Sequence, residues 1–76
     1  MSEAANGLVC VEFYGSSDPR ELIAAVDAPA GQERTCAIQI GQILCRFRAR
    51  DSINAVMMDA DGTIIERMII TRKAGG

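Results

Sequence analysis

The segment Asp59-Ala60-Asp61-Gly62 constrains the fold more than any other, because it separates two apolar runs in the second half of the chain. Glycine after aspartate supplies the positive φ that hairpin turns require. The flanking runs, Ile53 to Met58 and Thr63 to Thr71, contain many β-branched residues. Consecutive strands joined by a short turn are antiparallel neighbours, so the sequence predicts a β-hairpin here.

This predicted hairpin is apolar on both faces, because its apolar residues are contiguous at Val56-Met57-Met58 and again at Met68-Ile69-Ile70. Such a hairpin needs cover on both faces. A helix could cover one face, and a second protein chain, identical or foreign, could cover the other. Alternatively, the sheet curls into a barrel or folds over itself. The candidate partner-binding residues on the hairpin are Met57, Met58 and Ile69.

A helix is predicted from Pro19 to Ala28. Asp18 is placed to cap its first amides, proline suits the first helical position, and Glu21 completes a capping box. Pro29 then ends the helix, because the residue before proline resists helical geometry.

Three further strands are predicted at Leu8 to Tyr14, Arg34 to Ile40 and Ile43 to Ala49, with bends at Gly41 and at residues 50–52. In the third strand, apolar residues alternate with arginines, which places the arginines on one face. The candidate partner-binding residues on that face are Arg46, Arg48 and Arg50.

These elements predict an α+β fold in the order β-α-β-β-β-β, with a mostly antiparallel sheet and one helix packed on one face. We expect residues 8–72 to form the single domain, between a flexible N-terminus (1–7) and a flexible tail (73–76). With 76 residues the core is small, so association with another chain or a second copy would stabilise the domain.

The residue types argue against catalysis and against a metal or cofactor. The chain has no histidine and no CxxC pair, and its three cysteines (Cys10, Cys36 and Cys45) are interpreted as buried free thiols. No run approaches the roughly 18 apolar residues of a membrane span, and residues 1–7 lack a signal-peptide pattern. We therefore expect a non-enzymatic cytoplasmic protein that does not contact membranes.

Charge is segregated along the chain. Residues 1–33 contain six acids and one base, whereas residues 34–76 contain four acids and seven bases. Arginines on alternate positions of a strand would be about 6.6 to 6.8 Å apart, near the phosphate repeat of an extended single strand. Nucleic acid is therefore the alternative partner for the arginine face, although the aromatic side chains usual on such sheets are missing from it.

Three short resemblances suggest other functions. Asp59-Ala60-Asp61-Gly62-Thr63 is similar to the first motif of haloacid dehalogenase-type phosphatases, which implies a nucleophilic Asp59 and an acid-base Asp61. Only thirteen residues follow Thr63, too few for that family's further motifs, so a hairpin turn is preferred. The segment from Gly41 to Arg67 resembles potato-inhibitor-type serine protease inhibitors, which implies a reactive segment at Cys45-Arg46-Phe47. The final Gly75-Gly76 resembles ubiquitin and the sulfur-carrier proteins, which implies a carrier.

The function expected from these observations is protein binding by surface occupation, as an inhibitor, adaptor or assembly subunit that self-associates. The alternatives are nucleic-acid binding through Arg46, Arg48 and Arg50, protease inhibition, and a carrier role.

Overall fold

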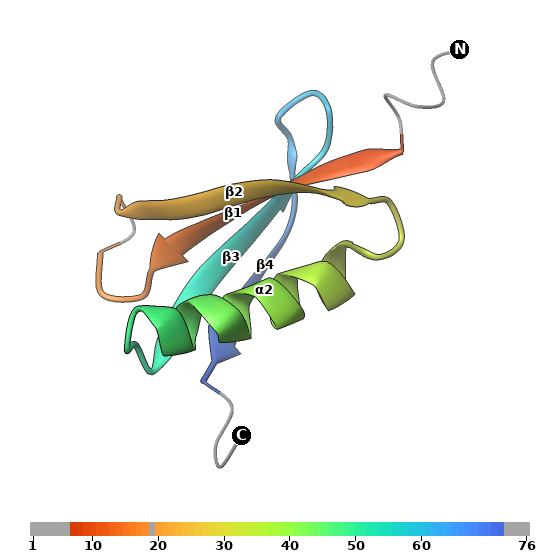
Figure 1. Ribbon diagram of the computed structural model, residues 1–76. Coiled ribbons are helices and arrows are strands. Elements are labelled where there is room, and N and C mark those ends of the chain that lie inside the picture. The colour runs from red at the N-terminus through yellow and green to blue at the C-terminus, as the bar shows by residue number, and fades with distance from the viewer. Residues whose placement is uncertain (1–6, 19, 73–76) are drawn as a thin grey trace.

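The computed structural model describes residues 7–18 and 20–72, which form one four-stranded sheet and one long helix (Figure 1). The elements in chain order are β1 (Leu8–Gly15), β2 (Leu22–Pro29), α2 (Glu33–Phe47), β3 (Ser52–Met58) and β4 (Ile64–Thr71).

The sheet has the strand order β2-β1-β3-β4, and every neighbouring pair is antiparallel. Two hairpins, β1-β2 and β3-β4, therefore meet along the central β1-β3 pair. Helix α2 connects them and lies across one face of the sheet (Figure 1). The described residues thus make two layers, and the other face of the sheet has no layer over it.

The predicted class is confirmed: this is a small α+β domain with an antiparallel sheet and one helix on one face. The order of its elements is β-β-α-β-β, so the predicted order contained one strand too many. The strands predicted at Leu8 to Tyr14, Ile53 to Met58 and Thr63 to Thr71 are present with nearly those bounds.

The helix predicted from Pro19 to Ala28 is wrong, because Leu22–Pro29 is strand β2. Asp18 does cap amides, but those of a turn: its side chain accepts the amide of Arg20 at 3.1 Å, and its carbonyl oxygen accepts the amide of Glu21 at 3.0 Å. Aspartate makes the same local bonds at turns as at helix starts. Pairing with β1 then overrides the helical propensity of this alanine-rich segment.

The two strands predicted between Arg34 and Ala49 are also wrong, because this segment is α2. Its fully buried positions, Ala37, Gly41 and Cys45, are four residues apart, and the half-buried Cys36, Ile40 and Leu44 run beside them. This is the stripe of an amphipathic helix. Gly41 is not a bend: an added Cβ there would lie 3.1 Å or less from three atoms of Ile70, so glycine allows α2 to approach β4 closely.

The turn at Asp59 is confirmed. One carboxylate oxygen of Asp59 accepts the amides of Asp61 at 2.9 Å and Thr63 at 3.0 Å, and Gly62 has a φ of +84°. The Asp59 carboxylate thus accepts hydrogen bonds from two amides of its own turn. This explains why an aspartate occupies this position between the two strands.

The core lies between α2 and the sheet. Every second residue of β1 and β3 points into it, and Phe13, Ile53 and Met57 are its largest fully buried side chains. Two ion pairs join distant segments at its margin: Arg34 of α2 binds Glu66 of β4, and Arg50 donates to Glu21 at 2.7 Å.

Candidate protein-binding surface

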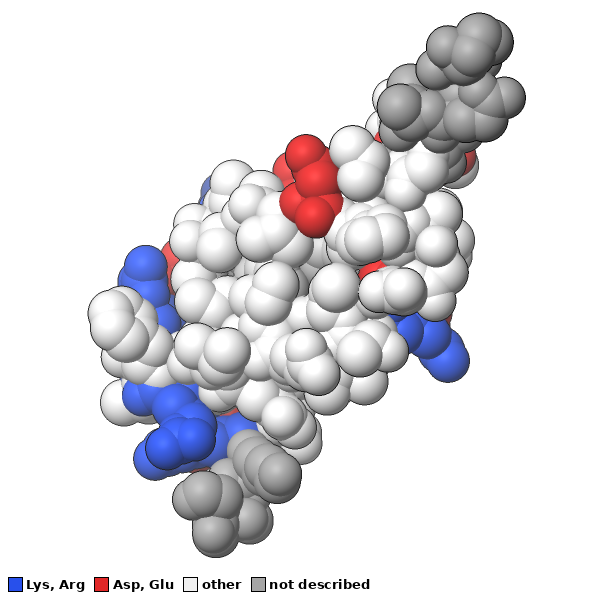
Figure 2. Space-filling model, turned by 45° about the vertical axis from the view of Figure 1, so that its right-hand side comes forward, with Lys and Arg blue, Asp and Glu red and all other residues white. Residues whose placement is uncertain are grey.

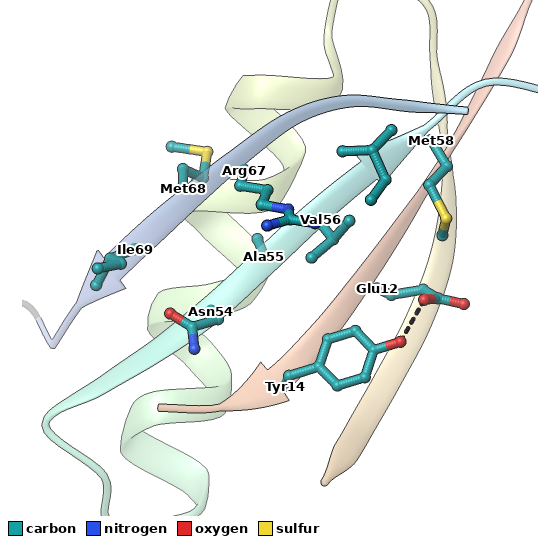
Figure 3. Close-up of a pocket in the computed structure, with 10 residues that line it drawn as sticks. Glu12, Tyr14, Asn54, Ala55, Val56, Met58, Arg67, Met68 and Ile69 are labelled. Carbon is teal, nitrogen blue, oxygen red and sulfur yellow. Dashed lines mark hydrogen bonds between the residues drawn. The ribbon is translucent and has the colours of Figure 1, made fainter. Parts of the chain in front are cut away.

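The face of the sheet opposite α2, here called the open face, consists of the alternate strand residues that point away from the core. Several are large and apolar, and the side chain of Ile69 is 68% exposed. A partly open hollow over β1, β3 and β4 occupies the middle of this face (Figure 3). The residues of the open face used below are Leu8, Cys10, Glu12, Tyr14, Leu22, Asp27, Asn54, Val56, Met58, Ile64, Arg67 and Ile69.

The centre of the open face is a row of three residues on adjacent strands. Glu12 of β1 pairs with Val56 of β3, and Val56 pairs with Arg67 of β4. An acid and a base therefore flank an apolar residue, each one strand from it, about 4.8 Å away. In Figure 3 the side chain of Arg67 extends over β3 beside Val56.

The two charged groups of this row do not bind each other. Glu12 accepts the hydroxyl of Tyr14 at 2.5 Å, drawn as the dashed line in Figure 3. Within residues 7–18 and 20–72, neither of the two ion pairs involves Arg67. The hydrogen bond to Glu12 raises the pKa of the Tyr14 hydroxyl above its ordinary value, so the tyrosine remains a neutral donor at physiological pH.

The three cysteines are free thiols, of which Cys45 is buried and Cys10 and Cys36 are half-buried. Cys10 lies on the open face. Burial, and then the negative charges of Glu12 and Asp27, raise the pKa of its thiol. Burial likewise raises the pKa of Cys45. Neither thiol is activated as a nucleophile, since that requires a lowered pKa.

Two exposed apolar side chains lie on one flank of α2. Between Arg34 and Arg46 the helix has no charged residue, and Ile43 and Phe47 are 63% and 83% exposed. Figure 2 shows a broad uncharged area with basic and acidic groups at its margins. We call Ile43 and Phe47 the helix surface.

The structure separates the three arginines predicted to share a strand face. Arg46 is in the last turn of α2, Arg48 is its C-cap, and Arg50 follows in the loop and binds Glu21. No strand carries these residues, so the spacing that suggested nucleic acid does not exist. The reactive segment implied by the protease-inhibitor resemblance is also helical, with Cys45 buried in the core.

The three hairpin residues predicted to bind a partner divide between the two faces. Met57 is fully buried against α2, which rules it out as a surface residue. Met58 and Ile69 both lie on the open face and line its hollow. The prediction missed Glu12, Tyr14 and Arg67, although the alternation in β1 placed Glu12 and Tyr14 on the same side.

No group of three or more potential metal-binding side chains occurs among the described residues. Within the same residues, no helix is long and apolar enough to cross a membrane. Asp59 and Asp61, which match the phosphatase motif, lie in the hairpin turn, while Gly75-Gly76 and most of the two segments predicted to be flexible fall outside the described residues.

Comparison with protein-family models, curated proteins and solved structures gives no significant match for this chain.

Proposed function

We propose that this protein is a non-enzymatic protein-binding module that acts by occupying another protein surface through its open face. The observation that carries this proposal is the one-sided cover of the sheet: α2 packs on one face, while the opposite face exposes Leu8, Leu22, Ile64 and Ile69. Exposed large apolar side chains, interspersed with polar and charged ones on an uncovered sheet face, are typical of a protein interaction site.

The charges on the open face favour a protein over a nucleic acid. Arg67 is accompanied there by two acids, Glu12 and Asp27, and Tyr14 is the sole aromatic residue on the described strands of this face. A nucleic-acid-binding sheet needs several basic and stacking side chains together. A mixed surface of apolar, acidic and basic groups suits another protein.

A binding role also agrees with the chemistry of the groups present. The hollow is partly open to solvent, whereas catalytic sites usually enclose their substrate. The raised thiol pKa of Cys10 makes it a poor nucleophile. Three free cysteines suit a reducing compartment, and we place the module in the cytoplasm as an assembly subunit, adaptor or inhibitor.

The proposal is tested by immobilising the protein and comparing what it retains from its source cells with what two variants retain. Ile69→Glu introduces a charge into the open face, and Ile43→Glu introduces the same charge on the helix surface, where exposure is similar. Loss of a specific bound protein with Ile69→Glu alone supports the proposal. Retention with Ile69→Glu, or loss with Ile43→Glu alone, contradicts it.

A further inference from the structure

We infer that the occupant of the open face is a second copy of this chain, bound face to face so that Glu12 of each copy binds Arg67 of the other. This inference rests on the proposed function and specifies the partner. It follows from the central row of the open face, in which Val56 separates an acid from a base on the two neighbouring strands.

The geometry of a face-to-face pair limits the possible arrangements. A twofold axis that turns one sheet onto another must lie between the two sheets and parallel to them. If the axis runs along β3 above Val56, it exchanges the β1 side of one copy with the β4 side of the other. Glu12 then lies over Arg67 of the second copy, and the same pair forms again on the opposite side of the axis.

The neighbouring row is complementary under the same axis. Tyr14 pairs with Asn54, and Asn54 pairs with Ile69. The exchange therefore places the aromatic ring of Tyr14 over Ile69 of the second copy, covering one of the most exposed apolar side chains of the sheet. An aromatic side chain against an aliphatic one is a favourable interface contact.

The charges favour a twofold axis along β3 over a twofold axis that runs across the strands. An axis running across the strands would place Glu12 over Glu12 and Arg67 over Arg67, which is repulsive at both positions. Both groups lie one strand from the selected axis, about 4.8 Å. The roughly 30° rotation common between packed sheets displaces groups at this distance by about 2.5 Å, which the long side chains of Glu12 and Arg67 can span.

Glu12 and Arg67 are available for this contact. Within the described part of the chain, Arg67 has no carboxylate within 4.0 Å. Glu12 uses one carboxylate oxygen to accept from Tyr14, which leaves its other oxygen for a guanidinium group. The overlap covers β1, β3 and β4, three of the four strands, so we expect a reversible dimer whose population depends on concentration.

Charge reversal tests this arrangement. Sedimentation equilibrium over the micromolar range is used to compare the wild-type protein with Glu12→Arg, Arg67→Glu and the double variant that carries both changes. Each single reversal places like charges together twice per dimer and is expected to weaken the dimer at least about tenfold. The double variant restores both pairs with opposite polarity and should recover most of the affinity.

The double variant distinguishes a contact between copies from an effect on folding. Urea unfolding of each variant, at a concentration where the wild type is monomeric, serves as the control for fold stability. Weaker single variants with recovery in the double variant support the inference. A monomeric wild type, equal affinity in all four proteins, tighter binding in a single variant, or no recovery in the double variant overturns it.

The experiments distinguish failure of the second-copy inference from failure of the proposed function. If the protein is monomeric but Ile69→Glu still abolishes retention of a cellular protein, the open face binds a different partner and only the second-copy inference fails. If Ile69→Glu changes neither self-association nor retention, the proposed function fails as well.

Discussion

Replacement of Gly41 by alanine is expected to destabilise the protein, although alanine is the better helix former. A Cβ at this position would lie 2.5 Å from Cδ1, 2.9 Å from Cγ2 and 3.1 Å from Cβ of Ile70. The first atom can rotate away, but Cβ is fixed by the backbone of β4, and Cγ2 moves only if the restricted χ1 of this β-branched side chain changes. Relief therefore requires α2 and β4 to separate.

The magnitude follows from two opposing effects. Overpacking of a core costs about 1–3 kcal/mol, and we take about 2–3 here because branch atoms are contacted. Removing a glycine from a helix returns about 0.8–1.0 kcal/mol. The net loss is about 1–2 kcal/mol, which for a domain of this size lowers the thermal midpoint by roughly 5–15 °C.

The assay is urea and thermal unfolding at one fixed protein concentration, because any self-association changes apparent stability. Gln39→Ala, at an exposed position of the same helix, is the matched control and should lie within about 0.5 kcal/mol of wild type. In an Ile70→Leu background, which lacks the Cγ2 branch, Gly41→Ala should cost about 1 kcal/mol less. A stabilising Gly41→Ala, or an equal cost in both backgrounds, would refute the close-packing explanation.

Substitutions at three further positions test local features. Ala49 has a φ of +53° just after α2, so Ala49→Gly should raise stability by about 0.5–1 kcal/mol in urea unfolding, and a loss would contradict strain there. Asp59→Ala removes the acceptor of two turn amides and should cost about 1–2 kcal/mol, whereas Asp59→Asn, which keeps an acceptor, should cost less. The hydrogen bond from Arg34 lowers the pKa of Glu66, so the stability it provides is present above the ordinary glutamate range and is lost as pH falls through the lowered pKa. Unfolding curves of wild type and Glu66→Gln should thus differ at neutral pH and converge in acid; a difference independent of pH would contradict this origin.

The C-terminal hairpin was predictable because its turn and both strands act locally. Asp59 and Gly62 specify the turn through hydrogen bonds and φ, and no distant contact is needed to form it. The identities of β2 and α2 were not recovered, for two different reasons. In β2, pairing with β1 outweighs helical propensity, which is a tertiary effect. In α2 the four-residue spacing of Ala37, Gly41 and Cys45 was readable, but Gly41 was interpreted as a break.

The candidate surface was predicted in part. The contiguous apolar residues of the hairpin left two alternatives open, a partner chain or a sheet folded over itself; the described residues form one open sheet, and Met58 and Ile69 lie on its uncovered face. The sequence does not reveal which strands become neighbours. The row of Glu12, Val56 and Arg67 depends on β1 pairing with β3, and these strands are separated by β2 and α2. The acid and base come together only through this long-range pairing.

That long-range pair also determines how the chain can fold. The β1-β2 and β3-β4 pairs each close a short loop, whereas β1 and β3 must meet across the whole segment between them. Loop-closure entropy makes such a contact late and slow compared with local hairpins. We therefore expect the β1-β2 hairpin and the unit of α2, β3 and β4 to form early, and the docking of β1 onto β3 to set the folding rate.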